Sequence, residues 1–316
     1  MESNSNYVVG IDAGGTKVAY GLFDSRGVII DRAQHPTDAE ADGPMLCDTL
    51  TANIITMMEK NSLTFDCLSG IGIGMPSFIF YDEGRIFLTS AIPGIKDFPM
   101  RDYLEKSLPA RIVLDNDSNA AALAEYRRGA GRGVRHMVYI TVGTGLGSGI
   151  IIDGKLFRGS YGWAGECGHM LATPDAGMMC GCENRGCYMS YASGKFLPAL
   201  VKQGLDNEIH STLTPETMDG PGIKTAFDAS DPLACTVVEQ IAHNIAVCVF
   251  NVYQMLNINT FVFGGGLVGF GEALLGKVYK EFDKYNKIAL PVTFKIAELE
   301  KDVGIIGAAE FVKGES

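Results

Sequence analysis

Residues Tyr7 to Asp24 read YVVGIDAGGTKVAYGLFD. Two runs rich in β-forming residues flank a glycine turn, a pattern that predicts a β-hairpin. Such a turn presents backbone N–H groups that phosphate oxygens can approach closely. Asp12, just before it, is suited to hold Mg²⁺ beside those phosphates, directly or through water. An ordinary Gly-Gly hairpin has the same pattern, so both interpretations stay open. The candidate phosphate-binding residues are Gly14, Gly15, Thr16 and Lys17.

The same unit occurs a second time. Residues Met137 to Asp153 read MVYITVGTGLGSGIIID, and a shift of 129 residues places Ile11 on Ile140 without gaps. The repeat predicts two α/β domains of similar plan, each with one phosphate loop, facing across a cleft to form a nucleotide site. Neither loop is a Walker A motif, because GxxxxGK[ST] is absent. The candidates in the second loop are Gly143, Thr144 and Gly145.

A third glycine-rich run follows a predicted strand at Asn259–Phe263. It formally matches GxGxxG after a strand, the pattern of a Rossmann NAD site. Only weak strand candidates follow it to extend a parallel sheet, which disfavours that interpretation. A nucleotide base resting on glycine backbone explains the same run, with Gly265 and Gly266 as its candidates.

The stretch from Gly165 to Cys187 reads GECGHMLATPDAGMMCGCENRGC. It supplies three cysteines and one histidine, the ligand count of a closed tetrahedral zinc site with bonds of about 2.0–2.3 Å. The spacing is not that of a zinc finger, and three buried structural thiols are the alternative. A crowded loop of glycines and charged residues favours the metal. The predicted ligands are His169, Cys180, Cys182 and Cys187.

A run of four polar residues, Asn116 to Asn119, follows a short apolar strand and precedes the helical sequence AAALAEYRRGA. Asp117 or Ser118 at a helix start is ordinarily a cap. The carboxyl end of a strand is also where ligands bind in α/β sheets. The pattern alone leaves both roles open. Further helices are predicted at Ala39–Lys60, Tyr188–Lys202 and Pro232–Leu256, and in the C-terminal DVGIIGAAEFV.

The composition is that of a globular protein with room for two domains in its 316 residues. A net charge of −11 argues against a nucleic-acid-binding surface. The start, MESNSN, has no apolar core of an export signal, and no 18-residue stretch predicts a membrane span. We therefore expect a cytoplasmic protein with no membrane partner, with reduced core thiols at Cys47, Cys67, Cys235 and Cys248.

Six stretches together resemble the ROK family of sugar kinases, related open reading frames and transcriptional repressors. They are IDAGGTK, LDNDSNAAALAE, TVGTGLGSGI, AGECGHM, the CGC-x4-C loop and FVFGGG. The resemblance implies an actin-like α/β fold, a duplicated ribonuclease H-like plan with two domains, a zinc loop and an active site in the cleft. We expect a small domain over residues 1–117, completed by a C-terminal helix at about 303–316, and a larger one over 118–302.

The resemblance also implies an activity, the ATP-dependent phosphorylation of a hexose hydroxyl, foremost the 6-hydroxyl of glucose or a related aldohexose. Asp117 would be the general base, and Asn116 and Glu166 would bind sugar hydroxyls. His169 would bind structural zinc through one ring nitrogen and face the sugar with the other. Mg²⁺ would accompany ATP. Among similar proteins homodimers and homotetramers are usual.

Several positions depart from the family pattern. Met189 stands where a sugar-binding Glu is expected, and Glu183 replaces a Gly. Pro76-Ser77 and Ala91-Ile92 stand where Pro-Gly and Pro-Asn-Leu are usual. Methionine accepts only weak hydrogen bonds, so one sugar hydroxyl loses its partner or faces an apolar wall. The choice among glucose, allose, an N-acylhexosamine and another hexose stays open.

A sugar-responsive regulator is the alternative from a different class. Family repressors carry a helix-turn-helix ahead of the first phosphate loop, whereas only Met1–Asn6 precede that strand here. Direct DNA binding is therefore not expected, and a sugar sensor without a DNA-binding domain is the remaining alternative. Retention of Asp117 and both glycine loops favours the kinase.

Overall fold

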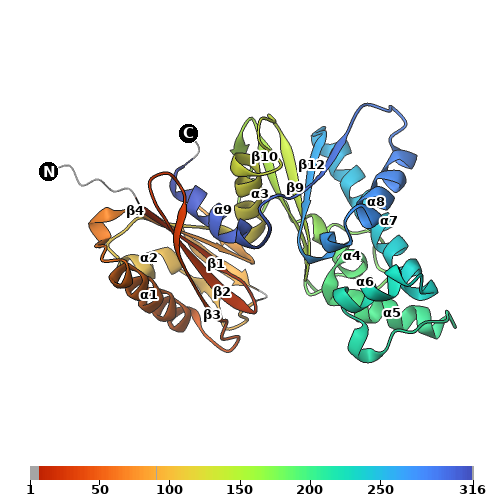
Figure 1. Cartoon of the computed structure of the whole chain (residues 1–316), viewed down its shortest axis with the longest axis horizontal. Coiled ribbons are helices and arrows are strands. Elements are labelled where there is room, and N and C mark those ends of the chain that lie inside the picture. Colours follow the sequence, from red (N-terminus) through yellow and green to blue (C-terminus); the bar gives the residue numbers. More distant parts are fainter. Residues whose placement is uncertain (1–6, 90, 315–316) are drawn as a thin grey trace. The chain divides into compact units, whose positions relative to one another are not determined.

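The computed structural model describes residues 7–89 and 91–314 (Figure 1). The polar start Met1–Asn6, on which the expectation of no export signal rests, lies outside the described residues. The chain forms two compact units, each containing helices and strands. The first unit comprises residues 1–135, 149–164 and 298–316, and the second comprises residues 136–148 and 165–297.

The first unit is built on a five-stranded sheet of order β3-β2-β1-β4-β8. Its strands are β1 (Tyr7–Ala13), β2 (Lys17–Phe23), β3 (Ile29–Pro36), β4 (Leu68–Met75) and β8 (Ile112–Asn116). β1, β2 and β3 are antiparallel neighbours, as the predicted hairpin requires, whereas β4 and β8 run parallel to β1. The carboxyl ends of β1, β4 and β8 therefore meet at one edge of the sheet.

Helices and a smaller sheet complete the first unit. The helices are α1 (Gly43–Lys60), α2 (Met100–Glu105), α3 (Asp117–Arg128) and α9 (Val303–Val312), with 3-10 turns η1 (Phe65–Cys67) and η6 (Glu300–Asp302). The smaller sheet contains β5 (Ser77–Phe80), β6 (Arg85–Thr89) and β7 (Lys96–Phe98). The two-residue strand β11 (Lys155–Leu156) pairs with the last residues of β10 (Leu146–Ile152), a strand that starts in the second unit and ends in the first.

Glycines let α9 lie directly on β1 and β4. A Cβ added at Gly10 would come within 2.1 Å of the Ile305 carbonyl oxygen, and one at Gly72 within 1.7 Å of the Ala308 carbonyl oxygen. No larger residue fits at either place without moving the helix. Val9 and Ile11, by contrast, belong to the core that also contains the buried face of α1. The sheet is thus buried on both faces, which explains its near-continuous apolar strands.

The second unit contains β9 (Met137–Val142), β12 (Thr260–Gly264) and β13 (Thr293–Ile296), with β12 parallel to both of the others. Its helices are α4 (Met189–Ala192), α5 (Leu197–Asp206), α6 (Gly220–Asp228), α7 (Pro232–Leu256) and α8 (Glu272–Tyr285). Its 3-10 turns are η2 (Cys167–His169), η3 (Gly194–Phe196), η4 (Pro215–Thr217) and η5 (Gly266–Phe270).

Helix α7 meets the length and composition of a membrane span, with a mean hydropathy of 1.6 over its most apolar window. The expectation that no stretch of the chain does so is therefore wrong. Within that window 56% of the residues are buried inside the structure. The apolar composition is thus that of a helix in a protein core, since a buried core helix can be as long and as apolar as a membrane span.

Two further expectations differ from the structure. The predicted helix at Tyr188–Lys202 is divided into α4, η3 and α5, because Ser193 is extended and Gly194 packs against the Gly143 carbonyl. The compact units also do not divide at residue 117. Helix α3 belongs to the first unit, where a Cβ at Gly307 of α9 would come within 1.9 Å of the Ala120 carbonyl oxygen.

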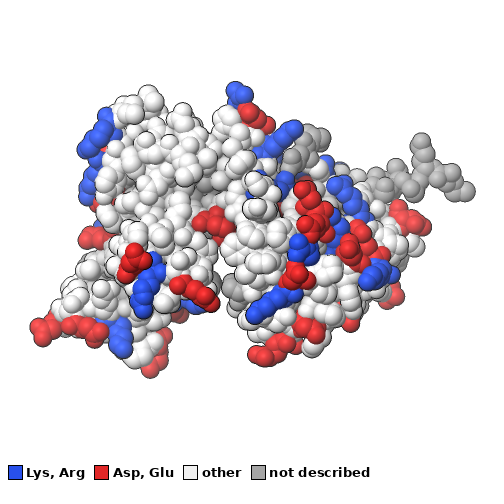
Figure 2. Space-filling model, turned by 180° about the vertical axis from the view of Figure 1, so that it is seen from behind, with Lys and Arg blue, Asp and Glu red and all other residues white. Residues whose placement is uncertain are grey.

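The surface carries charges of both signs. On the face shown in Figure 2, Lys and Arg side chains are interspersed with Asp and Glu. Ion pairs such as Arg32–Asp302 and Lys60–Asp31 lie on the first unit. On this face the acidic side chains therefore do not form a patch free of cations.

Candidate active site

The first glycine turn joins β1 to β2, and hydrogen bonds to its carbonyl groups hold it in place. The Gly14 N–H donates to the Lys17 carbonyl at 3.0 Å. Thr37, just after β3, donates its hydroxyl to the Gly14 carbonyl at 2.6 Å and its N–H to the Thr16 carbonyl at 3.0 Å. Gly15 and Thr16 are exposed. The carbonyls of the turn are therefore engaged within the unit, while its tip faces solvent.

Asp12 stands at the end of β1 and is partly buried. Burial raises the pKa of its carboxyl, and the positive charge of Lys17 offsets part of this rise. A Cβ at Gly304 would lie 2.3 Å from Asp12 Oδ2, so the carboxylate lies against the first turn of α9. The absence of a side chain at Gly304 makes room for it.

Asn116 and Asp117 lie where β8 passes into α3. The Asn116 side chain is the helix cap, because its Oδ1 accepts the Ser118 N–H at 2.8 Å. Asp117 is the first residue of the helix, and its Oδ1 accepts the same N–H at 2.9 Å. Burial raises the pKa of Asp117 to about 6, and the nearby charge of Asp12 adds to the rise. A carboxyl with this pKa is suited to accept a proton near neutral pH.

The strand register brings these acids to one edge. Asp12 of β1 pairs with Gly74 of β4, and Gly74 pairs with Asp115 of β8. Because neighbouring strands lie about 4.8 Å apart, the backbones of Asp12 and Asp115 are about 10 Å apart. A Cβ at Gly74 would lie 3.7 Å from the Asp117 Cα. The first turn of α3 therefore lies over this glycine, and Asp117 comes close enough to Asp12 for their charges to interact.

The second glycine turn lies between β9 and β10. The Gly143 N–H donates to the Gly145 carbonyl at 2.9 Å. The Gly143 carbonyl accepts the Gly194 N–H at 2.7 Å, and the Thr144 carbonyl accepts the Lys195 N–H at 3.1 Å. As in the first turn, backbone donors from elsewhere in the unit hold the carbonyls. Thr144 is exposed at the tip.

The third glycine run lies beside this second turn. A Cβ at Gly143 would be 3.6 Å from the Gly266 nitrogen and 3.9 Å from the Gly265 Cα. Gly265 has a φ of +91° and leaves β12 so close to the Val142 carbonyl that a Cβ would come within 2.6 Å of it. Gly265 and Gly266 therefore share one surface with the Gly143–Gly145 turn, as a nucleotide site would require.

The predicted metal ligands come together. The ligand atoms of His169, Cys180, Cys182 and Cys187 all lie within 4.8 Å of one another. The Cys180 sulfur is 3.5 Å from His169 Nδ1, and the Cys182 and Cys187 sulfurs are 3.6 Å apart. Tetrahedral zinc with bonds of about 2.0–2.3 Å requires ligand separations of about 3.5–3.8 Å. The donor set therefore fits zinc, and these two separations match those of a tetrahedral site.

His169 has its two ring nitrogens in different surroundings. Nδ1 faces the Cys180 sulfur, whereas Nε2 lies 4.0 Å from Glu166 Oε2. Burial lowers the pKa of His169, which favours the neutral ring that binds metals. Both residues are partly exposed on the η2 turn. The geometry is compatible with one nitrogen on a metal and the other beside Glu166.

Met189 is part of the wall behind the second turn. Its sulfur accepts the Leu146 N–H at 3.1 Å, and a Cβ at Gly145 would lie 3.6 Å from that sulfur. The side chain is partly buried. A methionine at this position thus supports the turn through a weak acceptor.

The sequence alone did not predict two residues that support the site. Arg158 pairs with the buried Asp115, and Thr37 holds the first turn. Arg158 lies 43 residues from its partner, and no spacing motif links them. The signal for Thr37 was equally absent, since one threonine after a strand is commonplace.

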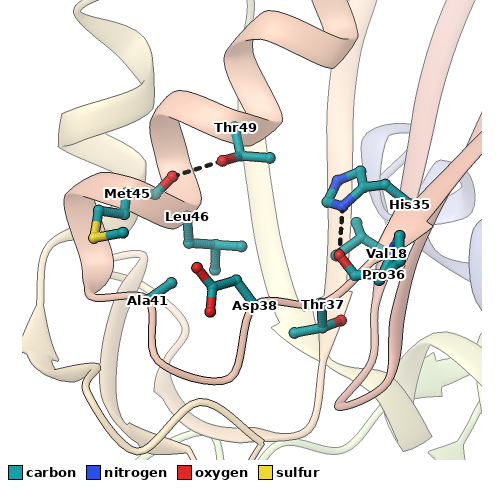
Figure 3. A pocket seen from close by; sticks show the side chains of 9 residues that line it. All are labelled: Val18, His35, Pro36, Thr37, Asp38, Ala41, Met45, Leu46 and Thr49. Atoms are coloured by element: carbon teal, nitrogen blue, oxygen red, sulfur yellow. Dashed lines mark hydrogen bonds between the residues drawn. The ribbon is translucent and has the colours of Figure 1, made fainter.

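A small pocket opens behind Thr37, between the end of β3 and the start of α1 (Figure 3). His35, Asp38 and Thr49 are among its lining residues. Its volume is about 70 Å³. Small-molecule sites usually measure about 300–1,000 Å³, so this pocket is too small for a hexose or nucleotide. It is of interest only because Thr37 lines it.

These features define an α/β protein with paired glycine turns, an acidic strand edge and a Cys₃His cluster. The ROK family model matches residues 8–315, and the chain belongs to the ROK family.

A glucokinase of Halalkalibacterium halodurans is 34% identical to this chain over 318 residues, covering 98% of this chain and 96% of the relative. The crystal structure of a ROK hexokinase from Thermus thermophilus is 30% identical, with a TM-score of 0.82 and 96% of each chain covered. A ROK family glucokinase from Streptomyces griseus, solved with glucose and AMPPNP, is 29% identical, with a TM-score of 0.81 and coverage of 97% of this chain and 99% of that one.

Proposed function

We propose that this protein is an ATP-dependent sugar kinase that phosphorylates a hexose, with the 6-hydroxyl of glucose as the first choice. The observation that carries the proposal is the partly buried Asp117 carboxyl, with its pKa raised to about 6, at a strand edge beside Asp12. The names of the glucokinase and hexokinase relatives support the same reaction.

Residues of the first unit would act on the acceptor. Asn116 would hydrogen-bond the sugar, and Asp117 would orient the attacking hydroxyl and take its proton. Such a base typically contributes about 10²–10⁴-fold to the rate. Asp12 would hold Mg²⁺, which neutralises phosphate charge when bound. The exposed Gly14–Lys17 turn offers donors and a cation to phosphate oxygens.

Residues of the second unit would bind the nucleotide, and two of them would bind sugar hydroxyls. The Gly143–Gly145 turn would bind phosphates, while Gly265 and Gly266 would offer flat backbone to the base. Their shared surface supports this assignment. Glu166 and His169 would bind sugar hydroxyls from the η2 turn.

Zinc would be structural. The Cys₃His cluster has the donor set and spacing of a closed tetrahedral site. One zinc per chain would fix the loop that carries His169 and thereby orient its second ring nitrogen. The zinc ion itself would take no part in the phosphoryl transfer.

The architecture would be the actin-like, two-domain sugar kinase fold with a zinc loop. The first unit contains a strand–glycine turn–strand element, β1–β2, and the second contains β9, the glycine turn after it and the first residues of β10, which supports a duplicated plan. A homodimer or homotetramer stays a prediction.

The identity of the sugar is the open part of the proposal. Met189 occupies the position where family members offer a carboxylate, and its sulfur is already paired with the Leu146 N–H. A sugar that does not need that carboxylate, such as allose or an N-acylhexosamine, is therefore a second candidate. Such a substrate would place a different group against Met189.

An ATP-consumption assay over a panel of hexoses tests the proposal. The panel contains glucose, mannose, allose and N-acetylglucosamine, each with and without Mg²⁺. We expect sugar-dependent and Mg²⁺-dependent ADP formation with at least one of them. Sugar binding by calorimetry without any turnover would instead support the sensor alternative and refute the kinase.

A further inference from the structure

Asp115 directly precedes Asn116 and Asp117, the two residues proposed to act on the sugar, and forms a buried ion pair with Arg158. Asp115 is only 1% exposed, and the Arg158 Nε–H donates to its Oδ2 at 2.7 Å. The Arg158 side chain is 13% exposed, and its guanidinium lies 3.8 Å above the ring of Tyr81. A guanidinium held between a carboxylate and an aromatic face has little freedom to move.

The other oxygen of Asp115 holds the start of α3. Asp115 Oδ1 accepts the backbone N–H of Asn116 at 2.7 Å and the side-chain amide of Asn119 at 2.9 Å. Asn116 in turn caps Ser118 and donates its side-chain amide to the Ser77 carbonyl at 3.3 Å. The orientation of Asn116 is therefore fixed by Asp115 on one side and the small sheet on the other.

Charge balance requires Arg158 here. Burial raises the pKa of Asp115, and the Arg158 charge is the largest influence opposing that rise. A buried carboxylate that loses the cation paired with it pays a large desolvation cost or takes up a proton. Either change weakens Asp115 Oδ1 as the acceptor for Asn116 and Asn119.

We propose that Arg158 is a positioning residue for the phosphoryl acceptor site. It orients Asp115, whose carboxylate sets the backbone of Asn116 and the first turn of α3, and so the position of the Asp117 carboxylate. This inference rests on the proposed kinase function. All of these residues lie in the first unit.

The test replaces Arg158 and compares the result with a matched ion pair. Arg158→Gln removes the charge, and we expect kcat to fall at least about tenfold, equivalent to about 1.4 kcal/mol in the barrier. The KM for ATP should stay within about twofold, since the phosphate turns keep their contacts. The KM for the sugar should rise, because Asn116 loses its fixed orientation.

The control is Arg128→Gln. Arg128 is the last residue of α3, at the opposite end of that helix from Asp117. It pairs with Glu310, whose side chain is 3% exposed. Its loss removes one cation from a buried carboxylate that keeps ion pairs to Arg127 and Lys313, and kcat should be retained. Equal losses of kcat in the two variants would reduce Arg158 to a stabilising residue and overturn the proposal.

Arg158→Lys keeps the test decisive if the glutamine variant does not fold. Lysine retains the charge but lacks the planar guanidinium. We expect a thermal midpoint close to that of the parent and a fall in kcat smaller than for Arg158→Gln. Unchanged kcat in a folded Arg158→Lys protein that has lost the contact to Asp115 in its crystal structure would also overturn the proposal.

Failure of the kinase proposal is distinguishable from failure of this one. A parent protein without sugar-dependent turnover refutes the proposed function, not the positioning. In that case, crystal structures of the parent and Arg158→Gln decide the question. Displacement of Asn116 and the Asp117 carboxylate supports the inference, and their unchanged position refutes it.

Discussion

Asp117 is subject to two opposing influences. Burial and the charge of Asp12 raise its pKa, whereas the N–H groups at the start of α3 lower it by bonding the ionised form. The balance leaves the pKa at about 6, so the carboxyl is mostly ionised at neutral pH but is a stronger base than an exposed aspartate. The residue can therefore hold a hydroxyl as an acceptor and still take its proton.

Replacing Asp117 by Asn keeps the shape of the side chain and removes the base. We expect kcat to fall by about 10²–10⁴-fold. Sugar affinity, measured by calorimetry, should change little, because Asn116 retains its cap and its bond to Ser77. Turnover of Asp117→Asn close to that of the parent would remove Asp117 from the catalytic role.

The raised pKa has a consequence for the pH profile. A base must be ionised to work, so kcat/KM should be level above the pKa of about 6 and fall about tenfold per unit below it. The ordinary aspartate value of about 3.9 would place this fall at much lower pH. Measuring kcat/KM across this pH range, while checking at each pH that the protein stays folded, tests the prediction. A level profile down to pH 4 would contradict the assignment.

At the residue scale, the sequence predicted the positions that form local motifs. Cys180, Cys182 and Cys187 were predictable together because their spacing already limits the distance between them. The sequence showed Asp117 as an acid at a strand end. It could not decide between a catalytic role and a helix cap, because capping depends on backbone geometry. The structure gives the cap to Asn116. The pairing of Arg158 with Asp115 depends on the completed fold.

At the scale of elements, the first glycine turn depends on a neighbouring strand end. The turn itself contributes one internal bond, from Gly14 to Lys17. Two more come from Thr37, through its hydroxyl and its backbone N–H. Backbone donors can be aimed at phosphate oxygens only if the turn does not rearrange, so the end of β3 is part of the proposed site.

Thr37→Val removes the hydroxyl while keeping the shape and the backbone bond. We expect the KM for ATP to rise several-fold with a smaller effect on the KM for sugar, because the Gly14 carbonyl loses its donor. Loss of one such bond costs about 0.5–1.5 kcal/mol, which corresponds to about 2–12-fold. Steady-state kinetics with each substrate varied in turn measures it.

Thr37→Ser and Thr49→Val are the controls for this prediction. Serine retains the hydroxyl and should restore the KM for ATP. Thr49 lines the same pocket but donates to Met45 within α1, away from the turn (Figure 3). Its replacement by Val should leave both KM values unchanged. A rise in the KM for ATP in Thr49→Val would assign the effect to the pocket in general.

Element prediction succeeded where a single periodic pattern dominated. The long apolar helix was predicted at Pro232–Leu256 and is found there as α7. It failed where tertiary contacts override the pattern. The run Tyr188–Lys202 is apolar at helical spacing, yet Gly194 must approach Gly143 closely, so the helix is broken into α4 and α5. Nothing local in the sequence marks that approach.

At the scale of the whole molecule, the repeated strand–glycine turn–strand pattern carried most of the information. It correctly placed a glycine turn between β1 and β2 and between β9 and β10. It did not indicate that α3 and residues 149–164 group with the first unit. That grouping follows from the packing of α3 on α9, where Gly307 admits the Ala120 carbonyl, a contact between residues far apart in the chain.

The proposed zinc site at the Cys₃His cluster predicts that the stability of the second unit depends on metal. The loop between η2 and α4 contains little regular structure, and the isolated bridges Leu171↔Cys187 and Met179↔Arg185 are its only strand-like pairings among the described residues. Its backbone hydrogen bonds, such as that from the Cys180 N–H to the Asn184 carbonyl, join residues within the loop itself. A metal that joins its two ends would then supply much of its order.

Cys182→Ser should therefore release zinc and loosen the second unit. Protein purified without added zinc should contain about one zinc per chain, and the variant much less. A loss of about 3 kcal/mol would lower the midpoint of that unit's thermal transition by roughly 6–12 °C. Cys235→Ser, a change on α7 outside the cluster, should alter neither quantity. A parent protein with far less than one zinc per chain, or an unchanged midpoint in Cys182→Ser, would show that the thiols order the loop without a metal.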